Sequence, residues 1–305
     1  MKELNRRGFL KKNAVGVSAG LIVPYWWTSA RAQDSEPASK NDRIRFALVG
    51  CGGMGRTDAG QARNYGDVVA VADVDSRRAR QAAQELSDNK ATVWEDHRQL
   101  IDKEDFDVLI CGTPDHWHTR VVVDAILAGK DVYCEKPLTL TIEEGQLLRD
   151  LVRDHDRIVQ VGTQQRSATN LFLKAIALVQ QGRLGDIRKV QCAIGGAPTS
   201  GPIPVTEPPS ELNWDRWLGQ APEVDFRATG DDRGGLGKTR CHYEFRWWYE
   251  YSGGKMTDWG AHHVDIGTWA LGMTGAADGP VSIEGTAKHP VEFKNGDPTS
   301  DDQYN

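Results

Sequence analysis

The sequence is poor in the features that define several classes of protein. It has five cysteines in 305 residues, an odd number with no C-x-x-C pair, which excludes a disulfide scaffold and gives no sign of a zinc knuckle or dithiol redox centre. Its apolar runs are too short and interrupted to suit a polytopic membrane protein. Because 39% of the residues are hydrophobic and 26% are charged, the chain also lacks the composition of a disordered protein.

Acidic residues outnumber basic residues outside the first 32 residues. Residues 1–32 hold six lysines and arginines against one acid, while the rest of the chain holds 31 bases and 42 acids. The net charge of −6 is therefore a basic leader of +5 followed by a body of −11. A body this acidic repels polyanions, so we predict no nucleic acid partner.

The basic leader has the form of an export signal. Arg6-Arg7 is followed by Gly-Phe-Leu-Lys, then by a modestly apolar segment from Ala14 to Trp27, and then by Ala30-Arg31-Ala32. This arrangement is typical of a secretory signal, and the adjacent arginines resemble a twin-arginine signal. We therefore expect a signal peptide over 1–32, recognition by the twin-arginine export machinery and a periplasmic location. Retention at the membrane by an uncleaved signal stays open.

Beyond a polar linker over 33–42, strand and helix patterns alternate. Short apolar runs predict strands at Ile44 to Val49, Val68 to Ala72, Val108 to Cys111, Val132 to Cys134 and Ile158 to Val161. Helical patterns lie between them, and Thr141-Ile142-Glu143-Glu144 has the form of a capping box. This alternation predicts an N-terminal Rossmann domain over 43–163, of the α/β class, with a doubly wound parallel sheet.

A glycine-rich turn follows the first predicted strand. Gly50-Cys51-Gly52-Gly53-Met54-Gly55 fits G-x-G-x-x-G and precedes a helical pattern, and Asp73 ends the next strand 23 residues after Gly50. In that setting the glycines allow a tight turn and close approach to a pyrophosphate, while the acid accepts from ribose hydroxyls. The residues we expect to bind NAD here are Gly50, Gly52, Gly53, Met54, Gly55 and Asp73. Arg77 and Arg78 keep NADP open, and export of a folded protein predicts a tightly held cofactor.

Two loops at the ends of neighbouring strands carry residues suited to chemistry. Thr113-Pro114-Asp115-His116-Trp117-His118 follows one strand, and Glu135-Lys136-Pro137 follows the next. Ligands bind at the carboxyl ends of strands in open α/β sheets, so the expected cofactor site also includes Thr113, Pro114, His118, Glu135 and Lys136. A lysine between an acid and a proline is rigidly placed, which suits Lys136 to hydrogen-bond a substrate hydroxyl and ease its deprotonation.

These motifs resemble the Gfo/Idh/MocA family, the glucose-fructose oxidoreductase and inositol dehydrogenase group. The resemblance spans roughly Ile44 to Leu271 and rests on Gly50 to Gly55, Ala72 to Asp75, Thr113 to His118, Ala128 to Leu138 and Gly253 to Asp265. It implies NAD(P)-dependent oxidation of a sugar or cyclitol hydroxyl. It also implies an α+β substrate-binding domain over 164–305 with an open, mostly antiparallel sheet that often mediates oligomerisation, so we expect a homo-oligomer. Family members usually continue past the point where this chain stops, which leaves open that the second domain is incomplete.

A helix predicted from Met256 to Gly272 carries further candidate site residues. Asp258, His262 and Asp265 are spaced i, i+4 and i+7, so all three share one face. The family has an Asp-x-x-x-His-x-x-Asp segment at this place. The resemblance implies that His262 is the general base, that Asp258 orients the substrate or polarises its hydroxyl, and that Asp265 holds a substrate hydroxyl or the imidazole.

Three other features of the second half bear on the site. Trp259 and His263 lie on the neighbouring stripe of the predicted helix, which we interpret as its packing face. Adjacent residues on a helix point about 100° apart, so His262 and His263 do not easily share an ion and we predict no metal site. Arg166 is either a substrate contact or part of a domain-interface ion pair.

The apolar pattern from Ile187 to Ile194 predicts a strand in the second half.

The combined pattern predicts an NAD(P)-dependent oxidoreductase. Lys136 and His262 would hold a secondary hydroxyl of a sugar, glycoside or cyclitol, and His262 would take its proton while the adjacent C–H gives hydride to the nicotinamide. One alternative is an NAD-dependent, redox-neutral glycosidase. Another is a non-catalytic protein that binds nucleotide and sugar, against which the set of Lys136, Asp258 and His262 argues.

Overall fold

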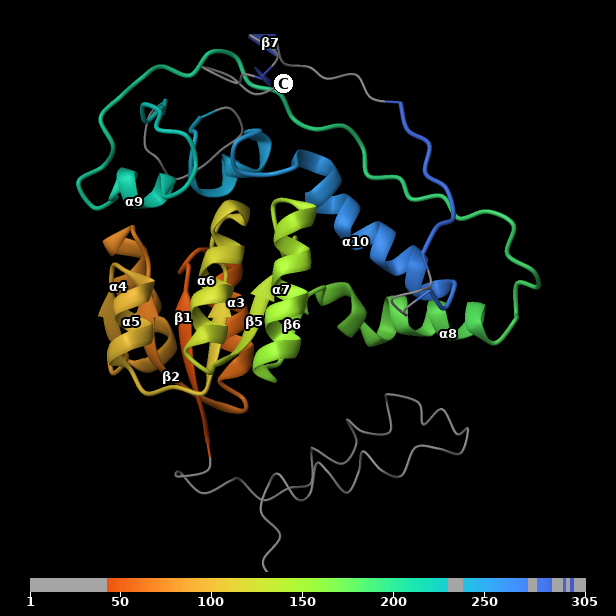
Figure 1. The fold of residues 1–305 in the computed structure, drawn as a ribbon, viewed down its shortest axis with the longest axis horizontal. Helices are drawn as coiled ribbons and strands as arrows, with labels where there is room; N and C mark the ends of the chain where they lie inside the picture. The colour runs from red at the N-terminus through yellow and green to blue at the C-terminus, as the bar shows by residue number, and fades with distance from the viewer. Residues whose placement is uncertain (1–42, 230–237, 274–278, 287–292, 295–296, 299–305) are drawn as a thin grey trace, which may run out of the picture. The chain divides into compact units, whose positions relative to one another are not determined.

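The computed structural model describes residues 43–229, 238–273 and 279–286, together with two short strands near the C-terminal end (Figure 1). The predicted signal peptide over 1–32 and linker over 33–42 lie outside the described residues and remain predictions, as does the domain boundary after residue 163. Within the described part of the chain, no helix has the length and apolar character needed to cross a membrane.

A six-stranded parallel sheet forms the first half of the described chain. Its strands are β1 (Ile44–Val49), β2 (Gly66–Ala72), β3 (Thr92–Trp94), β4 (Val108–Cys111), β5 (Asp131–Glu135) and β6 (Val159–Gly162). They pair in the order β3-β2-β1-β4-β5-β6, with every pair parallel. This is the strand order of a doubly wound dinucleotide-binding fold, with its reversal between β1 and β4. The predicted Rossmann architecture is confirmed.

Helices cover both faces of this sheet (Figure 1). They are α3 (Gly53–Ala62), α4 (Ser76–Ser87), α5 (His97–Lys103), α6 (Asp115–Leu127) and α7 (Ile142–His155). Side chains of α3 and α4 pack with Leu48 and Val71 on one face, and those of α5, α6 and α7 pack around Leu109 on the other. Burial on both faces explains why the central strands are short continuous apolar runs rather than alternating ones. The capping box between Thr141 and Glu144 forms as predicted.

The second half of the described chain is mainly helical and irregular. Its elements are η2 (Gln164–Ser167), η3 (Thr169–Leu173), α8 (Lys174–Gln180), α9 (Trp214–Leu218), η4 (His242–Trp247) and α10 (Gly254–Ala270). An aromatic core with Trp217, Trp248 and Tyr251 at its centre joins α9 to η4. Val74, which follows β2, packs against the same core, so the second half is built directly onto the carboxyl edge of the parallel sheet.

The strand predicted over Ile187 to Ile194 is wrong for the structure as described. Residues 187–194 have no hydrogen-bonded strand partner there. Val190 and Cys192 instead lie against α10 at Gly267, and the Cys192 thiol donates to the carbonyl of His263. Alternate residues of this segment therefore contact α10. An extended segment that lies along a helix gives the same alternation of apolar residues as a strand in a sheet.

Regular β-structure in the second half is small within the described ranges. β7 (Phe293–Lys294) pairs antiparallel with β8 (Asp297–Pro298). Isolated antiparallel bridges join Asp75 to Leu212, Val205 to Arg227 and Ala228 to Thr239. The first of these bridges ties the second half to the start of α4.

We predict that Gly55→Ala will destabilise the protein by about 1–3 kcal/mol, the usual cost of overpacking a rigid site. A Cβ at Gly55 would lie 2.0 Å from the carbonyl oxygen of Gly50 and 3.2 Å from Leu48. The free energy of unfolding in denaturant, measured without cofactor, checks this. Gly53→Ala, two residues earlier in α3, is the control because its Cβ would have no neighbour within 4 Å. Equal stability of the two variants would contradict the close packing of α3 on β1.

Candidate functional site

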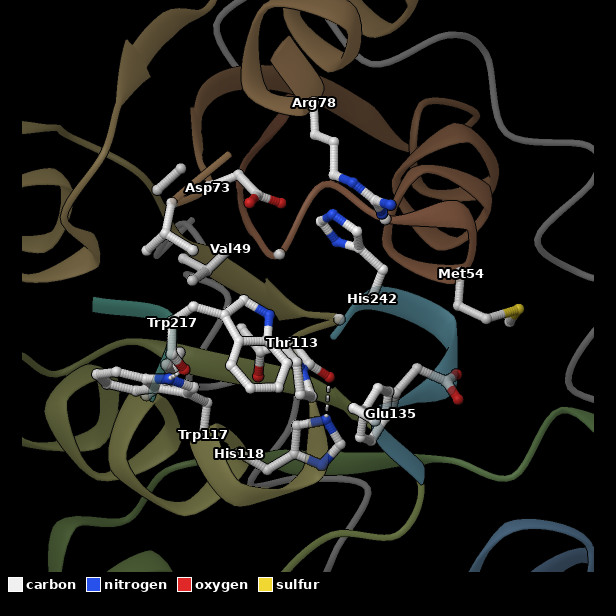
Figure 2. Close-up of a pocket in the computed structure, with 18 of the residues that line it drawn as sticks. Val49, Met54, Asp73, Arg78, Thr113, Trp117, His118, Glu135, Trp217 and His242 are labelled. Carbon is white, nitrogen blue, oxygen red and sulfur yellow. Dashed lines mark hydrogen bonds between the residues drawn. The ribbon is translucent and has the colours of Figure 1, made fainter. Parts of the chain in front are cut away.

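A cavity of about 800 Å³ opens at the carboxyl edge of the parallel sheet (Figure 2). Its floor comes from the ends of β1, β2, β4 and β5, and its walls include residues of α9, η4 and α10. The volume is that of a small-molecule site, and the position is where doubly wound folds bind ligands. Figure 2 shows Asp73 and Arg78 at one end of the cavity and Thr113, His118 and Glu135 at the other.

The structure brings together nearly all of the predicted cofactor residues. The cavity is lined by Gly50, Gly52, Gly53, Met54, Asp73, Thr113, Pro114, His118, Glu135 and Lys136. Gly55 is the exception, because it lies on the side of α3 that is buried against β1. Its predicted role in packing helix on strand is the one that the geometry supports.

The glycine turn leaves room for a ligand on one side only. Gly50 has φ +86°, in the left-handed region, and a Cβ there would lie 2.5 Å from the main chain of Gly112 and Thr113. At Gly52, by contrast, an added Cβ would meet only the Arg78 guanidinium, at 3.5 Å. The N-terminus of α3 directly behind it has no side-chain cap. Open main chain at a helix N-terminus favours an anionic group such as a pyrophosphate.

Asp73 is positioned by main-chain amides at the end of β2. Its Oδ2 accepts from the amide of Cys51 at 2.7 Å, and its Oδ1 accepts from that of Asp75 at 2.8 Å. Burial raises the pKa of this carboxyl, while the amides and the charge of Arg78 oppose the rise. Each oxygen keeps further acceptor capacity, which suits Asp73 to receive ribose hydroxyls. Arg77 and Arg78 both contact Asp75, at 3.1 and 3.4 Å.

A carboxyl pair lies beside the loop that carries Lys136. Glu135 is 5% exposed, and burial raises its pKa. Burial and the neighbouring Glu135 together raise the pKa of Asp58, on α3, to about 7. The neighbouring Glu135 disfavours a second negative charge on Asp58. Glu135 therefore faces the cavity beside a second buried carboxyl that resists ionisation.

Lys136 makes the ion pair that joins the parallel sheet to α10. Its Nζ lies 2.8 Å from Oδ1 of Asp258 and donates to the Asp258 carbonyl at 3.3 Å. Both side chains are 13% exposed and line the cavity. Arg246, on η4, approaches the same carboxylate at 3.6 Å. One carboxylate is thus held between two cations at the cavity wall.

His262 lies one turn after Asp258 and is buried, with 6% of its surface exposed. Burial, followed by the charge of Lys136, lowers its pKa, so the imidazole is neutral at pH 7. Its Nδ1 is buried and has no hydrogen-bond partner within the described part of the chain. The prediction that Trp259 belongs to the packing face is wrong, since Trp259 is 44% exposed. The helix turns its Asp258–His262 face inward because that face meets Lys136.

Arg166 and Asp265 form a bidentate ion pair with each other. Arg166 Nε and Nη2 donate to the two Asp265 oxygens at 2.7 and 2.6 Å. This is the ion-pair alternative considered for Arg166, and it ties η2 to α10. Arg166, Asp265 and His262 are not among the residues that line the cavity as described. Their roles toward a substrate remain predictions.

Several cavity residues are not among the site residues expected from the sequence. Trp117 and Trp217 both line it, and the Trp117 indole donates to the carbonyl of Trp217 at 2.8 Å. His242 lines it with φ +52°, an unusual conformation for a non-glycine residue. The position of Arg246 directly before two tryptophans in the sequence is a signal that could have pointed to a place in the cavity. His242 carried no such signal, since its backbone strain exists only in the folded chain.

These residues fit a bound NAD. The uncapped α3 N-terminus beside Gly52 suits the pyrophosphate, and Asp73 suits the adenosine ribose. Thr113, Glu135 and Lys136 line the continuation of the cavity toward α10. The donor set is that of a dinucleotide site.

Comparison with known proteins agrees with this geometry. Residues 44–163 match the model described as an oxidoreductase family with an NAD-binding Rossmann fold. Residues 199–294 match the model of the same family's C-terminal alpha/beta domain. Together the two models cover more than half of the chain, which therefore belongs to the Gfo/Idh/MocA family of oxidoreductases. The predicted fold class, family and NAD-binding domain are confirmed.

Individual relatives match over part of their length. An inositol 2-dehydrogenase from Gluconacetobacter diazotrophicus is 31% identical over 156 residues, covering 48% of this chain and 44% of that protein. A glycosyl hydrolase family 109 protein from a Shewanella species is 31% identical over 172 residues, covering 50% of this chain and 37% of that protein. The chain spans less than half the length of these curated relatives.

A solved structure supports the fold across more of the chain. The WlbA dehydrogenase from Bordetella pertussis, crystallised with NADH and UDP-GlcNAcA, is similar with a TM-score of 0.52 at 21% identity. The match covers 75% of this chain and 56% of the other. At this identity the likeness concerns architecture alone.

We predict that Asp73→Asn will weaken NAD binding about tenfold or more. An amide nitrogen in place of one carboxylate oxygen would face a main-chain N–H and would lose an acceptor for ribose. Calorimetric titration with NAD and NADP checks this. Asp102→Asn, at an exposed site on α5, is the matched control. Unchanged NAD affinity in Asp73→Asn would contradict the placement of the ribose.

Proposed function

We propose that this protein oxidises a secondary hydroxyl of a sugar, glycoside or cyclitol, with NAD as the electron acceptor. The observation that carries the proposal is the Lys136–Asp258 contact at 2.8 Å, at the wall of the cavity that begins at the glycine turn. Bound NAD supplies the acceptor for the hydride leaving the substrate carbon. The chain's own residues must hold the hydroxyl and take its proton.

Lys136 and Asp258 orient the substrate hydroxyl. A cationic Nζ donates to the hydroxyl oxygen and stabilises negative charge as the proton leaves. Asp258 holds the Nζ in place, and Arg246 at 3.6 Å holds Asp258. Because all three are largely buried, the arrangement is preorganised and costs little reorganisation during the reaction.

His262 serves as the general base. Its lowered pKa keeps the imidazole neutral and ready to accept at pH 7. Nδ1, buried and without a partner among the described residues, is the atom to which we assign the hydroxyl proton. Burial, together with the charge of Lys136, lowers the pKa of His262, so the proton is held weakly and returns readily to solvent. Asp265, paired with Arg166, fixes the same helix one turn further along.

The relatives support the substrate class and keep one alternative. Similarity to an inositol 2-dehydrogenase supports a polyhydroxylated ring as substrate. Similarity to a glycosyl hydrolase family 109 protein keeps the redox-neutral glycosidase as the second candidate. A purely binding role is disfavoured by the paired Lys136 and Asp258, since a binding protein has no need of a preorganised proton-transfer site.

We also propose that the protein is exported through the twin-arginine system to the periplasm with its cofactor already bound. The support is the Arg6-Arg7 leader, the apolar segment after it and the A-x-A end. A folded Rossmann domain can take up NAD in the cytoplasm before export, which suits a tightly held cofactor. NADP as the cofactor, and a homo-oligomer formed through the second domain, remain predictions.

We predict that Lys136→Met will lower turnover by about 10²–10⁴-fold while NAD binding persists, since a hydrogen-bond donor to the reacting oxygen is removed. The measurement is absorbance at 340 nm with NAD and pooled sugars, cyclitols and glycosides, followed by deconvolution of the active pool. Lys103→Met, at an exposed site on α5, is the control. NADH formation that survives in Lys136→Met would remove the role assigned to Lys136.

The same assay separates the alternatives. Consumption of a glycoside with release of free sugar and no net NADH would support the glycosidase. Absence of any consumption by protein that binds NAD would support a binding role. Either outcome would overturn the dehydrogenase proposal.

We predict that residues 1–42 fused to a folded fluorescent reporter will deliver it to the periplasm, and that Arg6→Lys with Arg7→Lys will abolish delivery. The adjacent arginines are the element that the twin-arginine machinery reads. Fractionation of cells checks this. Lys11→Arg with Lys12→Arg changes the same number of basic residues and should leave delivery intact. Cytoplasmic retention of the unaltered fusion would contradict the proposal.

A further inference from the structure

His118 occupies an unusual position between the two loops that form the cavity floor. It lies in the first turn of α6 and is 1% exposed. Its Nδ1 is 2.6 Å from the carbonyl oxygen of Pro137, and its Nε2 is 2.9 Å from that of Thr113. Figure 2 shows the contact with Thr113. One imidazole therefore bridges the loop after β4 and the loop after β5.

Both partners of this imidazole are hydrogen-bond acceptors. A carbonyl oxygen cannot donate, and a neutral imidazole carries a single N–H. A neutral His118 would therefore place a nitrogen lone pair against an oxygen at hydrogen-bond distance, whichever tautomer it adopted. Only the imidazolium, with an N–H on each nitrogen, satisfies both contacts.

A buried cation needs a counter-charge nearby. Sγ of Cys111, Sγ of Cys134 and a ring nitrogen of His118 all lie within 4.8 Å of one another. Cys111 and Cys134 are directly paired across β4 and β5, and both are fully buried. The titratable groups that face His118 from the surrounding elements are Cys111 on β4, Cys134 and Glu135 on β5, and Asp115 and His116 on α6.

Cys111 is the group best placed to carry that counter-charge. Burial opposes ionisation of its thiol, but the neighbouring Cys134, the charge of His118 and the Thr113 hydroxyl, at 3.4 Å from Sγ, together lower its pKa. Burial and Cys111 raise the pKa of Cys134, so Cys134 keeps its proton, and its thiol donates to the carbonyl of Glu135 at 3.5 Å. Despite burial, Cys111 and Asp115 raise the pKa of His118.

His116, two residues earlier on the same helix, shows how the pKa of a buried imidazole shifts when one of its nitrogens faces a carbonyl oxygen. It is 2% exposed, its Nε2 contacts the carbonyl of Trp217 at 3.0 Å, and its Nδ1 has no hydrogen-bond partner among the residues that the structure describes. Burial lowers the pKa of His116 to about 4, so this ring is neutral. Both rings are almost completely buried, and the difference lies in the number of acceptors and in the charges of Cys111 and Asp115 beside His118.

We propose that His118 is a positioning residue that stays an imidazolium through neutral pH, with Cys111 thiolate as its counter-ion, and thereby fastens the Thr113 loop to the Lys136–Pro137 loop. Its part in positioning Lys136 rests on the proposed function, but its charge state does not. A metal ion held by Cys111, Cys134 and His118 is the competing explanation. It would require His118 to give up one of its two carbonyl contacts.

The sign of the pH dependence follows from the raised pKa of His118. Because the folded protein binds this proton more tightly than the unfolded chain, the stabilisation is fully present below the ordinary histidine pKa of about 6.5. It is lost as pH rises through the folded pKa. One loop contact is then released, which loosens the loop that carries Lys136.

We predict that long-range ¹⁵N–¹H correlation spectra of the full chain, labelled at histidine, will show both ring nitrogens of His118 protonated from pH 6 to 8. His116 in the same spectra should show one protonated and one bare nitrogen. His118→Gln and His116→Gln provide the assignments. A bare nitrogen on His118 at pH 7 would overturn the proposal, and stoichiometric zinc in the purified protein, lost in Cys111→Ser, would replace it with a metal site.

Cys111→Ser tests the counter-ion. His118 should then lose its second proton at lower pH than in the unaltered protein, and kcat/KM at pH 8 should fall about tenfold, as expected for loss of one charge-assisted hydrogen bond. Cys241→Ser, at a fully buried site in the aromatic core, is the control and should change neither. An unchanged His118 titration in Cys111→Ser would remove Cys111 as counter-ion. The spectra need no substrate, so a failure of the proposed activity leaves this test intact.

Discussion

The ion pair between Lys136 and Asp258 is the contact on which the arrangement of the site depends. It joins the end of β5 to α10 across 122 residues of sequence and turns the face of α10 that carries His262 toward the parallel sheet. Two largely buried charges are stable only while they are paired. Arg246 approaches the same Asp258 carboxylate, and the Arg166–Asp265 pair holds the helix seven residues later, so ion pairs anchor α10 at two positions.

The cavity floor is organised by buried titratable groups. Burial and Glu135 raise the pKa of Asp58, and His118 needs two N–H groups to satisfy the carbonyls of Thr113 and Pro137. The second demand arises because buried polar atoms must have partners. The consequence is that the loops after β4 and β5 have a geometry tied to their protonation. The proposed oxidation would move a proton at this place, and the fold supplies a floor whose charges are held fixed.

Much of the first half could be predicted from local patterns. The glycine turn, Asp73 at the end of β2 and the capping box at Thr141 are short-range features whose chemistry dictates their geometry. β3 was missed because three residues, Thr92–Trp94, are too few to show a period. The segment over 187–194 was mistaken for a strand because its alternate apolar residues contact α10 rather than a sheet. Trp259 was placed on the wrong face because the helix orientation is set by Lys136, far away in sequence.

The sequence by itself determined the doubly wound sheet, the nucleotide end of the cavity and the family, since these follow from the spacing of glycines, apolar runs and one acid. Only the tertiary structure decided which charges meet. The pairing of Lys136 with Asp258, and of Arg166 with Asp265, joins residues about a hundred positions apart. The two carbonyls around His118 come from different loops in the same way. Hydrogen bonds and ion pairs act over a few ångströms of space, and that proximity arises only when the chain has folded.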